Sequence, residues 1–193
     1  MIITFCGQKG GTGKTTLSFL VAETLSRVGK RVAVRDDDPQ ASISQIVTEL
    51  REAGRTQLEI WDRDRAGEYD FVIVDTLPRL SSNVLIEAVK EADILILPLK
   101  PSMVDIRATL PAVEMVKENT RPGGKAYVLW NMVKPGTRIS RELQGLEGML
   151  GMQVLKNSIP ERIGFTYATL QGYEAITGED RELLQRLVLE FVA

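Results

Sequence analysis

Three glycines within four residues separate an apolar run at the N-terminus from an amphipathic stretch. The loop reads Gln8-Lys9-Gly10-Gly11-Thr12-Gly13-Lys14-Thr15-Thr16. Glycines this close together allow positive φ angles, so backbone N–H groups turn inward at the start of a helix, where the helix dipole also favours an anion. This order of strand, loop and helix restricts the beginning of the chain to a β–α unit that binds phosphate.

The residues of this loop predict a triphosphate and a magnesium ion as its occupants. We expect Lys14 at the β- and γ-phosphates, the Thr15 hydroxyl on Mg²⁺ and Thr16 at a further phosphate oxygen. The loop from Lys9 to Thr16 supplies the predicted phosphate contacts. Two residues differ from an ordinary phosphate loop, because Gln8 stands where the general pattern has glycine and Lys9 is a second lysine.

Short β-branched runs alternate with helical patterns along the chain. The runs lie at residues 1–6, 31–34, 71–74, 94–97, 126–130 and, more weakly, 153–155. The first helical stripe is Leu17, Leu20, Val21 and Leu25, and Gly29 ends it. This alternation predicts an α/β fold, a P-loop NTPase whose mostly parallel, twisted sheet has helices on both faces, in one domain spanning residues 1–193.

Acidic residues follow two of the predicted strands, at the edge where an open parallel sheet binds its ligands. Asp36 and Asp38 come after residues 31–34, and Asp75 comes after residues 71–74. Asp75 is expected to hold Mg²⁺ through water; the alternative is that it caps a turn. No glutamate follows Asp75, so a hydrolytic base must come from elsewhere, and the segment from Asp36 to Gln40 has the clustered candidates. The alternative for that segment is a solvated acidic loop.

Composition indicates an ordinary globular protein, with 44% hydrophobic and 26% charged residues. The single cysteine, Cys6, ends an apolar run and cannot form an internal disulfide, so we expect it to pack in the core. The sequence shows no charged and apolar leader with a cleavage site, and no apolar stretch approaches the ~20 residues of a membrane span. A cytoplasmic protein is therefore expected.

The net charge of −2 conceals a basic segment. Residues 121–162 hold seven basic and three acidic side chains, which gives +4 there and leaves −6 for the rest of the chain. Such a segment can contact DNA phosphates without reading sequence, or it can simply be a solvated surface. The candidates for a DNA contact are Arg138, Arg141, Lys156 and Arg162.

Several motifs together resemble the ParA/MinD family of deviant Walker ATPases, and most of all its small ParA-type partition members. They are the loop from Lys9 to Thr16, the Asp36-x-Asp38-Pro39-Gln40 segment, the Tyr69-Asp70-Phe71-Val72-Ile73-Val74-Asp75-Thr76 strand, and the Pro-Ser-x-x-Asp segment that ends at Asp105. The family usually has apolar residues before and between the two aspartates of the second motif, where this chain has Arg35 and Asp37. Leu77 before Pro78 is a further departure.

The resemblance implies a homodimer that encloses two ATP molecules between its subunits. Lys9 would cross to the phosphates of the partner's ATP and join Lys14 and Asp36 as a catalytic residue. A cation that arrives only on assembly would stabilise transition-state charge, so hydrolysis would wait for the dimer. Asp36 would position the attacking water.

The resemblance also implies a switch and a base site. Asp38, Gln40 and Asp75 would sense the state of the nucleotide. Asn131 would meet adenine, together with the backbone near Pro160. The residues alone leave a second reading of Asn131 open, in which it caps the turn after its strand.

By the same resemblance, the protein would be a Mg²⁺-dependent ATPase, slow without a stimulating partner. Its ATP-bound dimer would bind DNA non-specifically, associate with the nucleoid, and release DNA when a ParB-like or cargo adaptor protein stimulates hydrolysis to ADP. Two alternatives stay open: a MinD-like ATPase that cycles on membranes, and a metabolic phosphotransferase or synthetase. No membrane contact is expected, because the amphipathic C-terminal tail is acid-rich and its Leu183, Leu187 and Phe191 stripe should dock on the core.

Overall fold

The computed structural model describes residues 1–78 and 82–193 of the chain. Within them, a six-stranded sheet has the order β3-β2-β4-β1-β5-β6, and every strand pair is parallel. The strands are β1 (Ile2–Phe5), β2 (Val32–Asp37), β3 (Glu59–Ile60), β4 (Phe71–Thr76), β5 (Ile94–Leu99) and β6 (Lys125–Trp130). The predicted fold class is confirmed.

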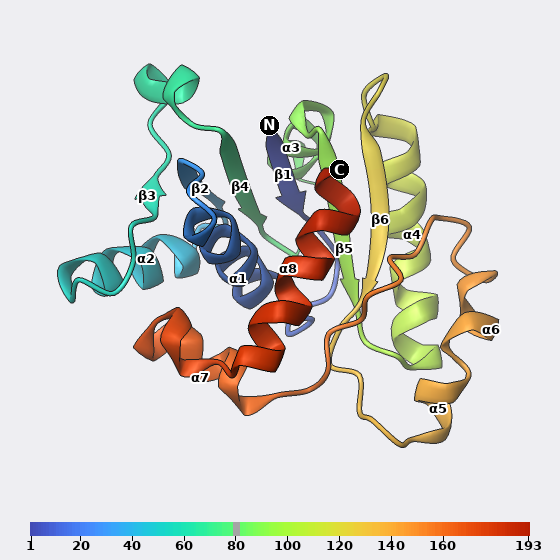
Figure 1. Ribbon diagram of the computed structural model, residues 1–193. Coiled ribbons are helices and arrows are strands. Elements are labelled where there is room, and N and C mark those ends of the chain that lie inside the picture. The colour runs from blue at the N-terminus through green and yellow to red at the C-terminus, as the bar shows by residue number, and fades with distance from the viewer. Residues whose placement is uncertain (79–81) are drawn as a thin grey trace.

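Helices cover both faces of the sheet, with α1 and α8 in front and α3 and α4 behind in the view of Figure 1. The α-helices are α1 (Lys14–Arg27), α2 (Ser42–Glu52), α3 (Asn83–Glu91), α4 (Met103–Asn119), α5 (Arg138–Arg141), α6 (Leu143–Glu147), α7 (Ile163–Gln171) and α8 (Gly178–Val192). The described residues also form two 3₁₀ helices, η1 (Arg63–Glu68) and η2 (Tyr173–Ala175). Parallel strands require such crossovers, which is why strands and helices alternate along the chain.

The side chains of each strand alternate between two cores, as the twofold period of a strand dictates. On β2, Val32 and Val34 belong to the core beneath α1, α2, α7 and α8, whereas Ala33 belongs to a cluster beneath α3. The predicted stripe of α1 is buried, and Leu187 and Phe191 dock α8 on the core as expected, with Leu183 partly buried against it. Cys6 is buried, and burial raises the pKa of its thiol to about 12, so it packs as predicted.

The two edges of the sheet differ from the sequence-based expectation. Residues 153–155 form an isolated bridge at Val154 with Val128 of β6, not a full strand. The sixth strand is instead β3, which the sequence did not indicate because only two residues pair with β2. Each of these two segments pairs with the sheet edge over only one or two residues, so neither extends the sheet by a long strand.

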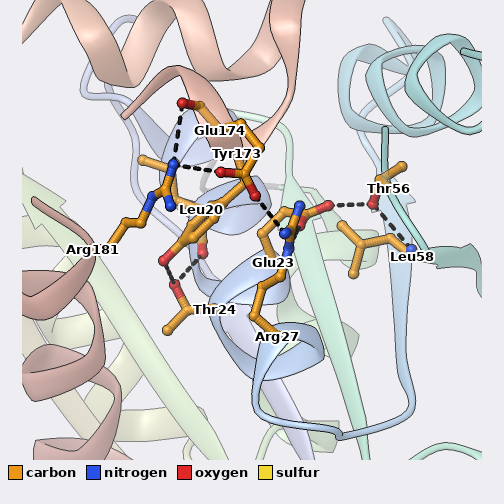
Figure 2. Close-up of polar contacts among 9 residues, drawn as sticks. All are labelled: Leu20, Glu23, Thr24, Arg27, Thr56, Leu58, Tyr173, Glu174 and Arg181. Atoms are coloured by element: carbon orange, nitrogen blue, oxygen red, sulfur yellow. Dashed lines mark hydrogen bonds and ion pairs between the residues drawn. The ribbon is translucent and has the colours of Figure 1, made fainter. Parts of the chain in front are cut away.

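A polar network ties the back of α1 to η2 (Figure 2). Tyr173 and Thr24 share a hydrogen bond of 2.9 Å, and the Thr24 hydroxyl also donates to the carbonyl of Leu20. The guanidinium groups of Arg27 and Arg181 lie 5.6 and 5.7 Å from the centre of the Tyr173 ring. The network fixes the turn that follows α7, and so helps to set the position of that helix.

Among the described residues, no helix combines the length and apolar character that crossing a bilayer requires.

Candidate nucleotide site

The phosphate loop follows β1 and ends at Lys14, the first residue of α1. Gly13 precedes the helix with a φ of 87°, and a Cβ at that position would clash with the side-chain amide of Asn131. The positive φ and the close approach both require glycine. The loop borders a cavity of about 280 Å³. Its lining residues are Gly10, Gly11, Gly13, Lys14, Thr15, Thr16, Asp38, Gln40, Ser42, Thr76 and Pro78.

Lys14 lines this cavity with only 7% of its surface exposed. Burial lowers the pKa of its ammonium, and the nearby carboxylate of Asp75 opposes that shift. A desolvated ammonium beside inward-facing N–H groups attracts an anion strongly. The surroundings of Lys14 therefore suit the phosphates that the sequence predicts for it.

Asp75 lies near the carboxyl end of β4, next to the first turn of α1. Its Oδ2 accepts a 2.5 Å hydrogen bond from the Thr15 hydroxyl, while its buried Oδ1 has no hydrogen-bond partner among the described residues. Burial raises the pKa of this carboxyl to about 6. A partnerless carboxylate oxygen beside a hydroxyl is a donor set that fits Mg²⁺. Thr15 and Asp75 are thus the residues that would hold the ion.

Asp36 and Asp75 are direct neighbours on the paired strands β2 and β4. Both oxygens of Asp36 accept backbone N–H groups, from Asp38 at 3.1 Å and from Ser44 at 3.0 Å, so Asp36 fixes the start of α2. Asp38 lines the phosphate cavity together with Gln40, whereas Asp36 is not among its lining residues. The catalytic role of Asp36 and the switch roles of Asp38 and Gln40 stay predictions.

The side chains of Lys9 and Lys14 have different surroundings, although both belong to one loop and the Lys14 ammonium donates to the Lys9 carbonyl at 3.4 Å. The Lys9 side chain is 47% exposed, and its ammonium forms an ion pair with Asp105 in the first turn of α4. Burial alone would raise the pKa of Asp105, but its hydrogen bonds with Lys9 and Ser102 hold the pKa below its ordinary value. Asp105 was missed as a partner of the loop. The Ser-x-x-Asp capping pattern at Ser102, which starts α4, was the available signal.

A second cavity of about 400 Å³ shares Gly13 and Thr16 with the first. Its other lining residues are Leu17, Leu20, Asn131, Met132, Ile159, Pro160, Glu161, Arg162, Ile163, Phe165 and Thr166. Mostly apolar walls with a few polar groups suit a nucleobase. Asn131 and Pro160, the two predicted adenine residues, both line it. The sequence did not identify the α7 residues of this cavity, because apolar residues that line a base pocket and apolar residues of a core follow the same pattern.

Asn131 also makes a contact that neither interpretation of its sequence, adenine binding or turn capping, predicts. Its buried side-chain amide donates a 2.7 Å hydrogen bond to the carbonyl of Thr12. The residue therefore tethers the phosphate loop while it lines the base cavity. Met132 follows with a φ of 55°, which a non-glycine residue rarely adopts, and it too lines the base cavity.

The four DNA candidates lie on three segments of the chain, with Arg138 and Arg141 together on α5. Arg138 forms an ion pair with Glu142 one turn along, and Arg141 donates to the carbonyl of Gly136. Arg162 lies 3.7 Å from Asp180 and also lines the base cavity. The fourth candidate, Lys156, is exposed in the connection between α6 and α7. Their contact with DNA stays a prediction.

Comparison with known proteins assigns the family. The nucleotide-binding domain model of the CobQ, CobB, MinD and ParA proteins matches residues 3–173. The chain belongs to this family. The resemblance to ParA and MinD proteins that the motifs indicate is therefore confirmed.

Two curated members of the CobQ/CobB/MinD/ParA family match most of the chain. The chain is 29% identical to the maintenance of carboxysome distribution protein A of Halothiobacillus neapolitanus, over 85% of this chain and 81% of the relative. It is 22% identical to the protein ParA of Rhizobium radiobacter, over 86% of this chain and 80% of the relative. An ATP complex of a Cyanothece McdA variant superposes with a TM-score of 0.78 at 15% identity, covering 98% of this chain and 96% of that one, which shows a common fold.

Proposed function

We propose that this chain is a Mg²⁺-dependent ATPase that positions DNA or another cargo by cycling between an ATP-bound homodimer and separate subunits. Its similarity to a carboxysome distribution protein and to a ParA protein supports a positioning role. The observation that carries the proposal is the different surroundings of the two lysine side chains of one loop. Lys14 is buried in the phosphate cavity, whereas Lys9 is half-exposed on the pair with Asp105.

Each group of the site has a task in hydrolysis. Lys14 and the loop N–H groups bind the phosphates, and Thr15 and Asp75 hold the cation, which neutralises phosphate charge when bound. Asp36 and Asp38 are the carboxylates available to orient the attacking water. A single subunit leaves Lys9 outside its own cavity, so a cation for the transition state arrives only when a second subunit docks.

The basic segment is the proposed contact with DNA. Arg138 and Arg141 lie on α5, and Lys156 lies in the exposed connection that follows α6. Contacts from such side chains to phosphates would give binding that ignores base sequence and weakens with salt. A cargo adaptor that stimulates hydrolysis would release the DNA.

Light scattering with ATP or ADP tests the dimer, using wild type, Lys9→Ala and Lys14→Ala. We expect wild type to dimerise with ATP and not with ADP, and Lys14→Ala to lose nucleotide and stay monomeric. Lys9→Ala should retain nucleotide, dimerise weakly and fail to release phosphate. Normal hydrolysis by Lys9→Ala would contradict the dimer mechanism.

Filter binding to random-sequence DNA tests the second half of the proposal. Binding should require ATP and fall about a hundredfold between 50 and 200 mM salt if four phosphates are contacted. Arg138→Ala with Arg141→Ala should weaken it, whereas the matched pair Lys90→Ala with Lys117→Ala, on α3 and α4, should not. Equal binding by the nucleotide-free protein would refute the DNA cycle.

Two assays separate the alternatives. Flotation with anionic liposomes in the presence of ATP would reveal a MinD-like membrane cycle. Phosphate release without any added acceptor distinguishes an ATPase from a phosphotransferase or synthetase.

A further inference from the structure

Two walls of the base cavity come from helices that are distant in sequence. Leu17 and Leu20 of α1 line the cavity, and so do Phe165 and Thr166 of α7. The two helices pack against each other. Their relative position therefore determines how much space a base has between them.

The 3₁₀ helix η2 folds back along α7. Gly172 ends α7 with a φ of 90°, and η2 follows at once. A Cβ at Gly164, in the first turn of α7, would lie 3.6 Å from the carbonyl oxygen of Ala175 at the end of η2. The turn that η2 contacts is thus the turn that brings Phe165 and Thr166 to the base cavity.

Tyr173 anchors η2 on α1 through two hydrogen bonds in sequence (Figure 2). The Thr24 hydroxyl donates to the carbonyl of Leu20 at 2.7 Å and lies 2.9 Å from the Tyr173 hydroxyl. A threonine hydroxyl has one hydrogen to donate, so the hydrogen between the two hydroxyls comes from Tyr173. Tyr173 and Thr24 are buried, with 4% and 2% of their surfaces exposed. The bonds end at Leu20, which itself lines the base cavity.

Charged side chains also surround Tyr173, but they hold η2 less firmly. Arg27 of α1 and Arg181 of α8 each pair with Glu174 at 2.6 Å, beside the Tyr173 ring. The Glu174 side chain is 63% exposed, and exposed ion pairs contribute little because water screens them. Breaking a buried hydrogen bond costs more, because it leaves a hydroxyl without a partner. The bond between Tyr173 and Thr24 is therefore the polar contact best able to fix η2 on α1.

We propose that Tyr173 is a positioning residue for the nucleobase. It holds η2 on α1, and η2 in turn contacts the first turn of α7, so the tyrosine sets the gap between the α1 and α7 walls of the base cavity. Tyr173 is not among the residues that line this cavity, and it acts only through the helices that do. The inference rests on the proposed function in taking this cavity as the base site, and it assigns a role to a residue outside that site.

Calorimetry with two ligands tests the inference, because ADP carries a base and tripolyphosphate carries none. Tyr173→Phe removes only the hydroxyl and should raise the Kd of ADP about two- to fivefold. The Kd of tripolyphosphate, which needs the phosphate loop alone, should stay at the wild-type value. A side chain that only stabilises the fold would change neither Kd of the folded protein.

Variants at Thr24 connect the effect to this one hydrogen bond. Thr24→Val removes the hydroxyl, keeps the shape of the side chain and should weaken ADP as Tyr173→Phe does. The two changes together should do no more than either alone, because both break the same bond. Thr24→Ser keeps the hydroxyl and should bind ADP like wild type.

Tyr69→Phe is the matched control. Tyr69 is also buried, its ring lies 5.5 Å from the guanidinium of Arg65, and its hydroxyl donates to Glu59 at 3.5 Å. It belongs, however, to the cluster beneath α3, not to the core beneath α1 and α7. The Kd of ADP should therefore be unchanged in Tyr69→Phe.

Four results would each overturn the inference. They are an unchanged ADP Kd in Tyr173→Phe, an equal loss of ADP and tripolyphosphate affinity, effects of the Tyr173 and Thr24 changes that add in full, and an equal loss of ADP affinity in Tyr69→Phe. Failure of the proposed function looks different, because wild type itself would then bind neither ligand, and the inference would fall with it.

Discussion

The ammonium of Lys9 and the carboxylate of Asp105 form an ion pair that joins the phosphate loop to the first turn of α4. Asp105 is nearly buried and is fixed by Ser102, which donates a 2.5 Å hydrogen bond to it, so the aspartate is the stationary partner. In the proposed dimer mechanism, Lys9 has to leave this position to reach a nucleotide on the second subunit. The pair therefore fixes the position of the Lys9 side chain in the single subunit.

Asp105→Asn should free Lys9 without removing the polar cap of α4. Because an ion pair with an exposed lysine contributes about 0.2 to 1 kcal/mol, we expect Lys9 to be acylated roughly 1.4- to fivefold faster by limiting acetic anhydride. Mass spectrometry of peptides measures the rate, with Lys90 and Lys117 as internal controls. An unchanged Lys9 rate would mean that the pair does not persist in solution.

Asp75→Asn should make the nucleotide-free protein more stable at neutral pH. The folded-state pKa of about 6 lies above the ordinary 3.8, so the stabilising contribution of protonated Asp75 is present below pH 3.8 and is lost as the pH rises through 6. At pH 7.5 the variant should gain about 2 to 3 kcal/mol in free energy of unfolding, and the gain should shrink toward pH 4.

Urea unfolding at both pH values, without Mg²⁺, measures this difference. Asp64→Asn, an exposed aspartate in η1, is the control and should change little. Asp75→Asn should also lose the effect of Mg²⁺ on nucleotide affinity. A variant less stable than wild type at pH 7.5 would show that the buried charge is compensated.

Asn131→Ala should weaken nucleotide binding about tenfold, because the phosphate loop loses its 2.7 Å tether at Thr12 and a buried carbonyl loses its donor. Calorimetry with ADP measures the affinity, and faster hydrogen exchange at Gly13 and Lys14 would locate the cause. Asn119→Ala removes a similar amide-to-carbonyl bond on α4 and should leave affinity unchanged. Equal affinity in both variants would leave Asn131 no role at the loop.

Tyr173→Phe should lower the free energy of unfolding by about 1 kcal/mol, because it removes the hydrogen bond that Tyr173 shares with buried Thr24. Chemical unfolding gives the value. Tyr167→Phe, on the exposed side of α7, is the matched control. A loss confined to Tyr167→Phe would place the stabilising contact elsewhere.

Local patterns were enough to predict the phosphate loop and the main strands. Gly11 and Gly13 permit the positive φ angles that a phosphate loop before a helix requires. A strand such as β5 is apolar throughout because both faces are covered. The same logic located Asp75 at the end of its strand. These features depend on neighbours in sequence, which is why sequence alone could reveal them.

Contacts between distant segments could not be predicted. The ion pair of Lys9 with Asp105 spans 96 residues, and the tether of Asn131 to Thr12 spans 119. The base cavity draws residues from α1, from the loop after β6 and from α7, which share no local signature. Arg35 and Asp37 were noticed only as departures, because Trp61 and Glu91, which Arg35 contacts, lie far from it in sequence.

The short strand β3 at one edge and the bridge at Val154 beside β6 leave the sheet with little free backbone for strand addition. Sheets with such blunted edges resist edge-to-edge polymerisation. Association with another copy or with a partner then depends on side chains at the strand ends and on helix surfaces. Contacts of that kind can form and break as a ligand binds and leaves, whereas a sheet shared by two subunits would hold them together.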